Sequence, residues 1–156
     1  MDTVTYPDPR IDALLRERFT GFKLNLAEKN PDFREAAGGS LVTWAPTFRF
    51  TDAKGREVRR TLGWLGPADF AAELHLALGH GHLARGRFDD ARTVFEEVAG
   101  GESRLAAEGG YLAGVAVFLG GKRDMAALKK RWDRLRAEHP GHDWAERASV
   151  IEDWKG

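Results

Sequence analysis

The chain has 156 residues, of which 42% are hydrophobic and 31% charged, so it has the composition of a globular protein with one core or two small units. Its 24 basic and 24 acidic residues balance, which gives no electrostatic sign of a nucleic acid or anionic membrane as partner. The longest apolar run, residues 111–119, is far shorter than the roughly 20 residues of a membrane span. The sequence has no cysteine, which excludes thiol chemistry by this chain and favours a reduced, cytoplasmic protein.

The residues before Gly66 predict short helices and strands. Pro9 suits the first turn of a helix, and apolar residues recur at helical spacing over 11–19. The stretch "FKLNL" (22–26) alternates apolar and polar residues, which predicts a half-buried strand. The stretch "NPDFREAAGG" predicts a short helix over 31–37 that ends at two glycines.

A β-hairpin follows. The residues "TFRF" (47–50) alternate, "DAKG" (52–55) has the composition of a turn, and residues 57–62 return as a second strand. Gly55 occupies the turn position that favours a left-handed backbone. The spacing predicts an antiparallel pair joined by a four-residue loop.

The chain becomes helical from Pro67 onward. Helices are predicted over 68–79 and within 88–98, 103–119, 124–139 and 142–154, with "RGR", "AGG", "GGK" and "HPG" as the turns. We interpret the glycines at 79, 86, 101, 114 and 121 as turn and close-packing positions. The predicted domains are residues 1–80 and 81–156.

The segment "ALGHGHLARGRFDDARTVFEEV" resembles a tetratricopeptide repeat, because Gly79, Gly86, Ala91 and Phe95 fall at the spacing of that motif. A generic helical hairpin can produce the same pattern. The resemblance implies a protein-binding face on these helices. Its candidate lining residues are His75, His82 and Tyr111.

The order helix, strand, short helix, Ala45-Pro46-Thr47, strand, Gly55 turn, strand, Gly63, helix resembles the thioredoxin fold from its second helix onward. The resemblance implies a cis peptide bond before Pro46 and a groove that binds extended peptides. The implied peptide-binding residues are Trp44, Ala45, Pro46 and Thr47. Trp44 also fits a simpler interpretation, as an aromatic residue packed on the sheet.

The predicted fold class is therefore α/β: a partial thioredoxin-like sheet of about three strands with flanking helices, followed by all-helical tetratricopeptide-like hairpins. The sequence departs from that family because the strand and Cys-x-x-Cys turn that precede the first helix are missing. Two alternatives stay open. The chain is a redox-inactive protein-binding module, or it is part of a thiol-disulfide oxidoreductase whose Cys-x-x-Cys lies upstream of Met1.

The missing central strand would leave residues 22–26 and 47–50 with unpaired edges. Three arrangements would satisfy those edges. The two strands pair directly, a strand such as "DTVTY" from a second copy fills the gap in a homodimer, or a partner's peptide adds there. We expect self-association or direct pairing.

The remaining sequence patterns give little indication of a metal site, a nucleic-acid surface or a catalytic site. His75 lies five residues before His80 and seven before His82, whereas helical metal ligands favour a spacing of four, so the histidines of "HLALGHGH" and "HPGH" predict no metal site. The basic run at 122–136 could face a nucleic acid, but a solvated helix side with Trp132 turned into the core explains it better. No phosphate loop or catalytic triad is visible, so we expect a protein or peptide partner and no cofactor, nucleic acid or membrane.

Overall fold

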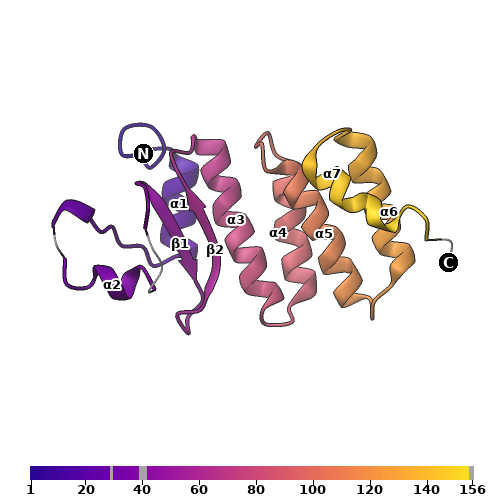
Figure 1. Cartoon of the computed structure of the whole chain (residues 1–156), viewed down its shortest axis with the longest axis horizontal. Coiled ribbons are helices and arrows are strands. Elements are labelled where there is room, and N and C mark those ends of the chain that lie inside the picture. Colours follow the sequence, from indigo (N-terminus) through magenta and orange to yellow (C-terminus); the bar gives the residue numbers. More distant parts are fainter. Residues whose placement is uncertain (29, 39–41, 155–156) are drawn as a thin grey trace. The chain divides into compact units, whose positions relative to one another are not determined.

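The computed structural model describes residues 1–28, 30–38 and 42–154, and the chain divides into two compact units, Met1–Pro67 and Ala68–Gly156 (Figure 1). The first unit holds a β-hairpin with short helices. The second unit is helical.

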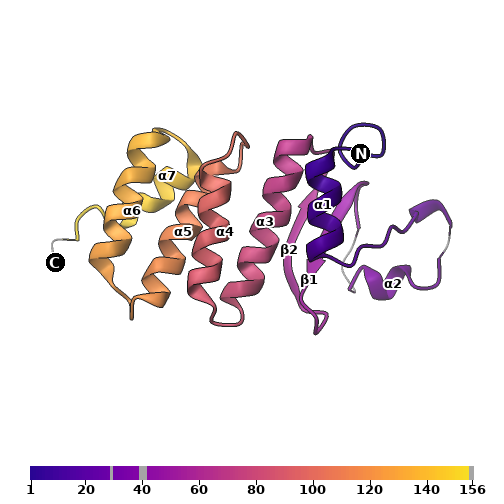
Figure 2. The ribbon, with the colours of Figure 1, turned by 180° about the vertical axis from the view of Figure 1, so that it is seen from behind.

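One helix of the first unit covers a face of the hairpin. Helix α1 (Pro9–Arg18) begins where the Asp8 carboxylate accepts a hydrogen bond from the backbone N–H of Arg10 (2.9 Å). It ends at Phe19, whose ring meets the ring of Phe50 edge to face with centroids 6.2 Å apart. Figure 2 shows α1 crossing the hairpin. The predicted helix is confirmed.

The predicted hairpin is also confirmed. Strands β1 (Thr47–Thr51) and β2 (Glu57–Leu62) pair antiparallel, with Thr47 opposite Leu62 and an irregularity between Phe50 and Thr51. The backbone at Gly55 is left-handed, with φ of +75°, as the turn requires. The Asp52 carboxylate stabilises the turn by accepting backbone hydrogen bonds from residues 54 and 56.

The predicted α/β class with a partial thioredoxin-like sheet is wrong. The sheet has two strands, β1 and β2, and the described residues are mostly helical. Residues 22–25, predicted as part of a strand, have no regular structure and run into a 3-10 turn at Leu26–Glu28. They do not pair with β1, so the expected direct pairing of these segments is wrong as well.

Local hydrogen bonds explain why "FKLNL" is not a strand. The Asn25 side chain accepts a bond from the Ala27 backbone N–H (3.0 Å) and donates one to the Glu28 carboxylate (2.9 Å), so it turns the chain. Phe22 is largely exposed instead of packing on a core. The segment "DTVTY" also forms turns, in which the backbone N–H groups of Val4 and Thr5 bond to the Met1 carbonyl.

A short helix, α2 (Phe33–Ala36), lies within the predicted 31–37 segment and contacts the hairpin through its carbonyl end. The Arg49 guanidinium donates to the Ala36 carbonyl (2.9 Å), which holds α2 near β1. The Thr5 hydroxyl, fully buried, donates to the Leu65 carbonyl (2.6 Å) and joins the N-terminal turn to the segment after β2.

The second unit is a row of antiparallel helices joined by tight turns (Figures 1 and 2). The sequence-predicted helices are all present. Their bounds are α3 (Pro67–Leu83), α4 (Phe88–Ala99), α5 (Ala106–Gly120), α6 (Met125–Glu138) and α7 (Asp143–Ala148), and a 3-10 turn follows at Ser149–Ile151.

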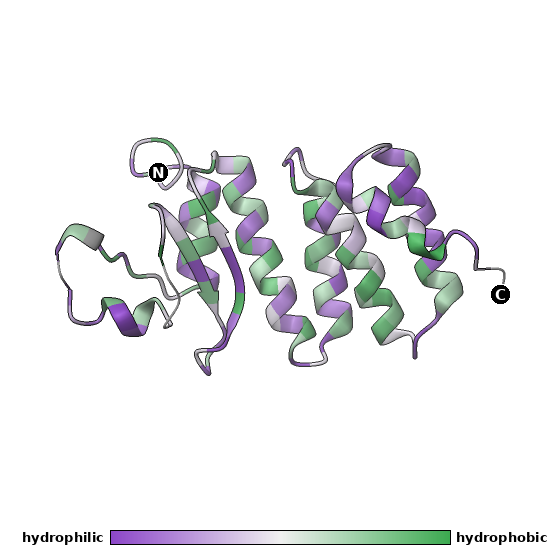
Figure 3. Ribbon diagram, viewed as in Figure 1, coloured by the Kyte–Doolittle hydropathy of each residue, from purple (hydrophilic) through white to green (hydrophobic). Residues whose placement is uncertain are grey.

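Two apolar clusters hold these helices together, and α5 contributes to both. Figure 3 shows α5 as the most continuously hydrophobic helix of the row, consistent with its place between neighbours. Phe95 of α4 is fully buried among residues of α3 and α5. Trp132 of α6 lies in the second cluster with Ala107 and Ile151, so the prediction that Trp132 faces the core is confirmed.

Glycines let the helices approach closely at three interfaces. A side chain at Gly79 would overlap the Phe95 ring between α3 and α4. One at Gly109 would come within 2.9 Å of the Phe95 carbonyl, and one at Gly114 within 2.6 Å of Trp132 Nε1. The close-packing interpretation is thus confirmed for Gly79 and Gly114.

Candidate binding surface

The segment that enters β1 is held in a fixed conformation. The Ala45–Pro46 peptide bond is cis, as the resemblance around Ala45-Pro46-Thr47 implies. The Gly63 backbone N–H donates to the Pro46 carbonyl (2.8 Å), and the Thr47 hydroxyl donates to the Trp44 carbonyl (2.6 Å). The chain before β1 therefore lies next to the chain after β2, at the open end of the hairpin.

Three large apolar side chains are exposed at this open end. Trp44 is 67% exposed, Leu62 is 55% exposed and Trp64 is 60% exposed. The Trp64 ring lies near Gly66, where a methyl group would come within 3.5 Å of Trp64 Cη2. We call Trp44, Pro46, Leu62 and Trp64 the tryptophan surface.

The exposure of Trp44 decides between its two interpretations. An aromatic packed on the sheet would be mostly buried, whereas this side chain is mostly in contact with solvent. The hydrogen bond to its carbonyl from Thr47 fixes the backbone of Trp44, and its ring is left free to contact another molecule. The simpler packing interpretation is wrong.

The hairpin as a whole is basic. Residues 47–62 contain five basic side chains against two carboxylates, a formal charge of +3. The hydrogen bond from Arg60 has the largest effect on the pKa of Glu57; burial opposes it, but with the further bond from Arg49 the pKa stays below its ordinary value. The Asp52 carboxylate pairs with Arg56, and that hydrogen bond holds the pKa of Asp52 low.

The second predicted surface, on the helices, consists of residues in three separate environments. His75 Nε2 lies 3.6 Å from a Glu97 carboxylate oxygen, across the α3–α4 interface. His82 is buried, with Nδ1 3.7 Å from a carboxylate oxygen of Asp90. Both histidines thus face carboxylates of α4.

Tyr111 has a packing role between aromatic neighbours. Its ring stacks on Trp132 with centroids 4.5 Å apart and an interplanar angle of 17°, and it also contacts Trp144 at 5.1 Å. The Trp132 indole N–H donates to the Tyr111 carbonyl (3.1 Å), and the Arg147 guanidinium covers Trp144 at 4.6 Å. These contacts join α5, α6 and α7 and leave Tyr111 half-buried.

Sequence reasoning found Trp44, Ala45, Pro46 and Thr47 but missed Leu62 and Trp64. Ala45 is exposed, and Pro46 and Thr47 are half-buried. A usable signal for Trp64 is present in the sequence, because tryptophans stand just outside both ends of the predicted hairpin. An antiparallel register brings such flanking positions to the same end.

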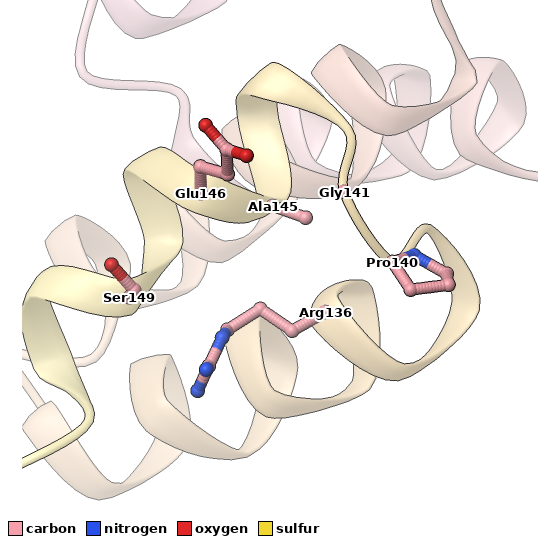
Figure 4. Close-up of a pocket in the computed structure, with 6 residues that line it drawn as sticks. All are labelled: Arg136, Pro140, Gly141, Ala145, Glu146 and Ser149. Atoms are coloured by element: carbon pink, nitrogen blue, oxygen red, sulfur yellow. The ribbon is translucent and has the colours of Figure 1, made fainter.

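A shallow depression of about 330 Å³ lies between α6 and α7 (Figure 4). Its one cationic side chain, Arg136, is held by Glu152 at 3.0 Å, and Glu146 adds a second carboxylate nearby, so an anion would meet competing charge. Over the described ranges no three histidine or carboxylate side chains are grouped to hold a metal ion. Within the same ranges no helix is long and apolar enough to cross a membrane. The lining residues are Arg136, Pro140, Gly141, Ala145, Glu146 and Ser149.

Comparison of the chain with protein-family models, curated proteins and solved structures found no match. The tetratricopeptide resemblance therefore stays a prediction.

Proposed function

We propose that this chain is a protein-binding module that engages a protein or peptide partner through the tryptophan surface. The observation that carries the proposal is the exposure of Trp44, Leu62 and Trp64 around one end of a hydrogen-bonded hairpin. Exposed apolar groups that gather in one place on a soluble protein are typical of interaction sites. Tryptophan is also enriched among the residues that contribute most to binding energy.

The rigid backbone beneath these side chains supports the proposal. Trp44 and Trp64 stand on segments joined by the Gly63–Pro46 hydrogen bond, and Leu62 belongs to β2 itself. A partner that buries these residues would not have to order them first, which lowers the entropic cost of association. A reducing cytoplasm, favoured by the composition, is the compartment that we propose for this activity.

A selection with random peptides displayed on phage tests the proposal. Immobilised full-length protein should enrich peptides that bind it in titration calorimetry. The W44A/W64A double variant should weaken those peptides at least about tenfold, because central tryptophans commonly contribute more than 1 kcal/mol each.

Val150→Ala is the matched control. Val150 is 80% exposed but lies in the second unit, outside the tryptophan surface, so its truncation should leave the affinity unchanged. Equal binding by the wild type and W44A/W64A would contradict the proposal. A circular dichroism spectrum of W44A/W64A that matches the wild type would show that the loss is not caused by unfolding.

A further inference from the structure

The outer edge of β1 offers backbone groups for another strand. In an antiparallel pair, hydrogen-bonded and non-hydrogen-bonded residue pairs alternate. The Gly63–Pro46 bond marks the first hydrogen-bonded pair, so Phe48 with Thr61 is the next. Thr47 and Arg49 lie at the intervening positions, and their backbone N–H and C=O groups point away from β2.

No third strand meets this edge among residues 1–28, 30–38 and 42–154. The hydrogen-bonding pattern of a strand edge fits an extended backbone, since only an extended chain repeats its donors and acceptors every two residues. The edge also begins beside Trp44. An added strand would therefore run along β1 between the turn and the tryptophan surface.

The charge of the hairpin indicates which kind of strand would add to β1. The formal charge of +3 on residues 47–62 favours a segment that carries carboxylates. Lys54, in the exposed turn, has no ion pair among the described side chains. A second copy of this hairpin would bring a second charge of the same sign, which disfavours self-pairing at this edge.

We infer that the outer edge of β1 accepts an extended acidic segment of a partner protein as a third strand. This inference rests on the proposed function and adds to it the conformation and the charge of the partner. The main-chain bonds at Thr47 and Arg49 would provide affinity independent of sequence, and apolar side chains on the added strand would reach the tryptophan surface.

Blocked heptapeptides provide the test. The acidic probe is Ac-ETVEVTE-amide and its matched basic control is Ac-KTVKVTK-amide, and each is titrated against the ¹⁵N-labelled full-length protein. We expect the acidic peptide to bind at least about tenfold more tightly than the basic one. At saturation, amide exchange at Thr47 and Arg49 should slow at least about tenfold, while exchange at Arg60 and Leu62, on the other edge, should not change.

Backbone methylation of the acidic peptide tests the main-chain bonds directly. One version is N-methylated at odd positions and the other at even positions. Because an edge contacts alternate residues of an added strand, one version should lose at least about tenfold in affinity and the other much less. Lys54→Glu should weaken the acidic peptide several-fold, whereas the same charge change at exposed Lys130 in α6 should not.

Several results would overturn the inference. Binding without slower exchange at Thr47 and Arg49, or equal binding of both methylated versions, would exclude strand addition. Equal binding of the acidic and basic probes would exclude the charge preference. If exchange at these amides is already slow in the free protein and becomes slower as the protein concentration rises, a second copy occupies the edge.

Failure here is distinguishable from failure of the proposed function. If the phage-selected peptides still depend on Trp44 and Trp64 but leave exchange at Thr47 unchanged, the tryptophan surface binds a partner without strand addition. If neither heptapeptide binds, the inference is wrong, and the phage selection alone then decides whether the tryptophan surface has a binding function.

Discussion

Gly79 and Gly81 stand two residues apart in α3 but have opposite surroundings. A methyl group at Gly79 would overlap the buried Phe95 ring, whereas nothing lies within 4 Å of the corresponding position at Gly81. Gly79→Ala should therefore destabilise the second unit by about 1–3 kcal/mol, because the packed core has to shift. The measurement is urea unfolding followed by circular dichroism.

Gly81→Ala is the matched control for that substitution. It adds the same methyl group to the same helix without a clash, and alanine favours a helix interior over glycine by roughly 0.5–1 kcal/mol. We expect this variant to be as stable as the wild type or more stable. If both alanine variants unfold at the same urea concentration, the close approach of Gly79 to its neighbour does not determine the stability of the α3–α4 interface.

Asp69 connects the first turn of α3 to the loop before α5. Its carboxylate accepts hydrogen bonds from the Ser103 hydroxyl (2.9 Å), the Arg104 backbone N–H (3.1 Å) and the Arg104 guanidinium (2.7 Å). Burial raises its pKa, but the bonds from Arg104 and Ser103 outweigh that effect and keep the pKa below its ordinary value. The native state thus favours the ionised form.

The ionisation of Asp69 makes the stability of the protein depend on pH in a definite direction. A carboxyl with a lowered native pKa contributes stability above its unfolded pKa of about 4, and that contribution is lost as the pH falls through the native value. Asp69→Asn should cost about 1–2 kcal/mol at pH 7. The measurement is urea unfolding at several pH values. The difference in unfolding free energy between the wild type and Asp69→Asn should shrink as the pH falls below 4.

Asp133→Asn is a suitable control for Asp69→Asn. Asp133 forms an ion pair with Lys129 (2.8 Å) on the exposed side of α6, where such a pair contributes little. We expect a change of at most a few tenths of a kcal/mol at any pH. A loss at Asp69 that is constant from pH 7 to pH 2 would contradict the role assigned to its ionised form.

At the scale of elements, the hairpin depends on a left-handed turn residue. Gly55 has a φ of +75°, and nothing lies within 4 Å of a Cβ at that position, so the effect of a substitution there is purely conformational. Gly55→Ala should destabilise the hairpin by about 1 kcal/mol, whereas Gly55→Asn should cost less, because asparagine tolerates this conformation better.

Amide exchange at Phe48 and Phe50 reports this effect locally. Both residues lie in hydrogen-bonded pairs of the hairpin, so their exchange should be fastest in Gly55→Ala, intermediate in Gly55→Asn and slowest in the wild type. An asparagine variant as fast as the alanine variant would mean that φ at residue 55 does not control the turn.

Helices and strands whose determining residues lie within one short segment could be predicted from the sequence. The hairpin has its turn residues and alternating strands in one short segment, and the helices have caps, spacing and glycine turns of their own. The strand at 22–26 could not be judged in this way, because a strand forms only beside a partner and Asn25 provides a competing turn. The fold class was wrong for that reason.

The candidate site was predicted in part for a similar reason. Trp44, Ala45, Pro46 and Thr47 are contiguous, so a motif could indicate them together. Leu62 joins them only through the register of β1 and β2, which also brings Trp64 to the same end of the hairpin. Exposure is a property of the folded chain, and tryptophan occurs both in cores and at binding sites. Trp132, for example, is in the core.

At the scale of the whole molecule, the five tryptophans divide by environment. Trp44 and Trp64 of the first unit are mostly exposed, Trp132 of the second unit is buried, and Trp144 and Trp154 are half-buried against the second cluster. Their fluorescence should therefore show two classes of accessibility to acrylamide. The Stern–Volmer plot of the wild type should curve downward, because the exposed indoles are quenched first.

The W44F/W64F double variant tests this assignment without removing an aromatic ring from either position. It should lose most of the easily quenched fluorescence and give a shallower, straighter plot, while helical circular dichroism stays unchanged because neither tryptophan belongs to a helix. In concentrated urea both proteins should quench uniformly, since every indole is then exposed. If the double variant in buffer were quenched as readily as the wild type, Trp44 and Trp64 would be covered in solution, and the tryptophan surface would not be available to a partner.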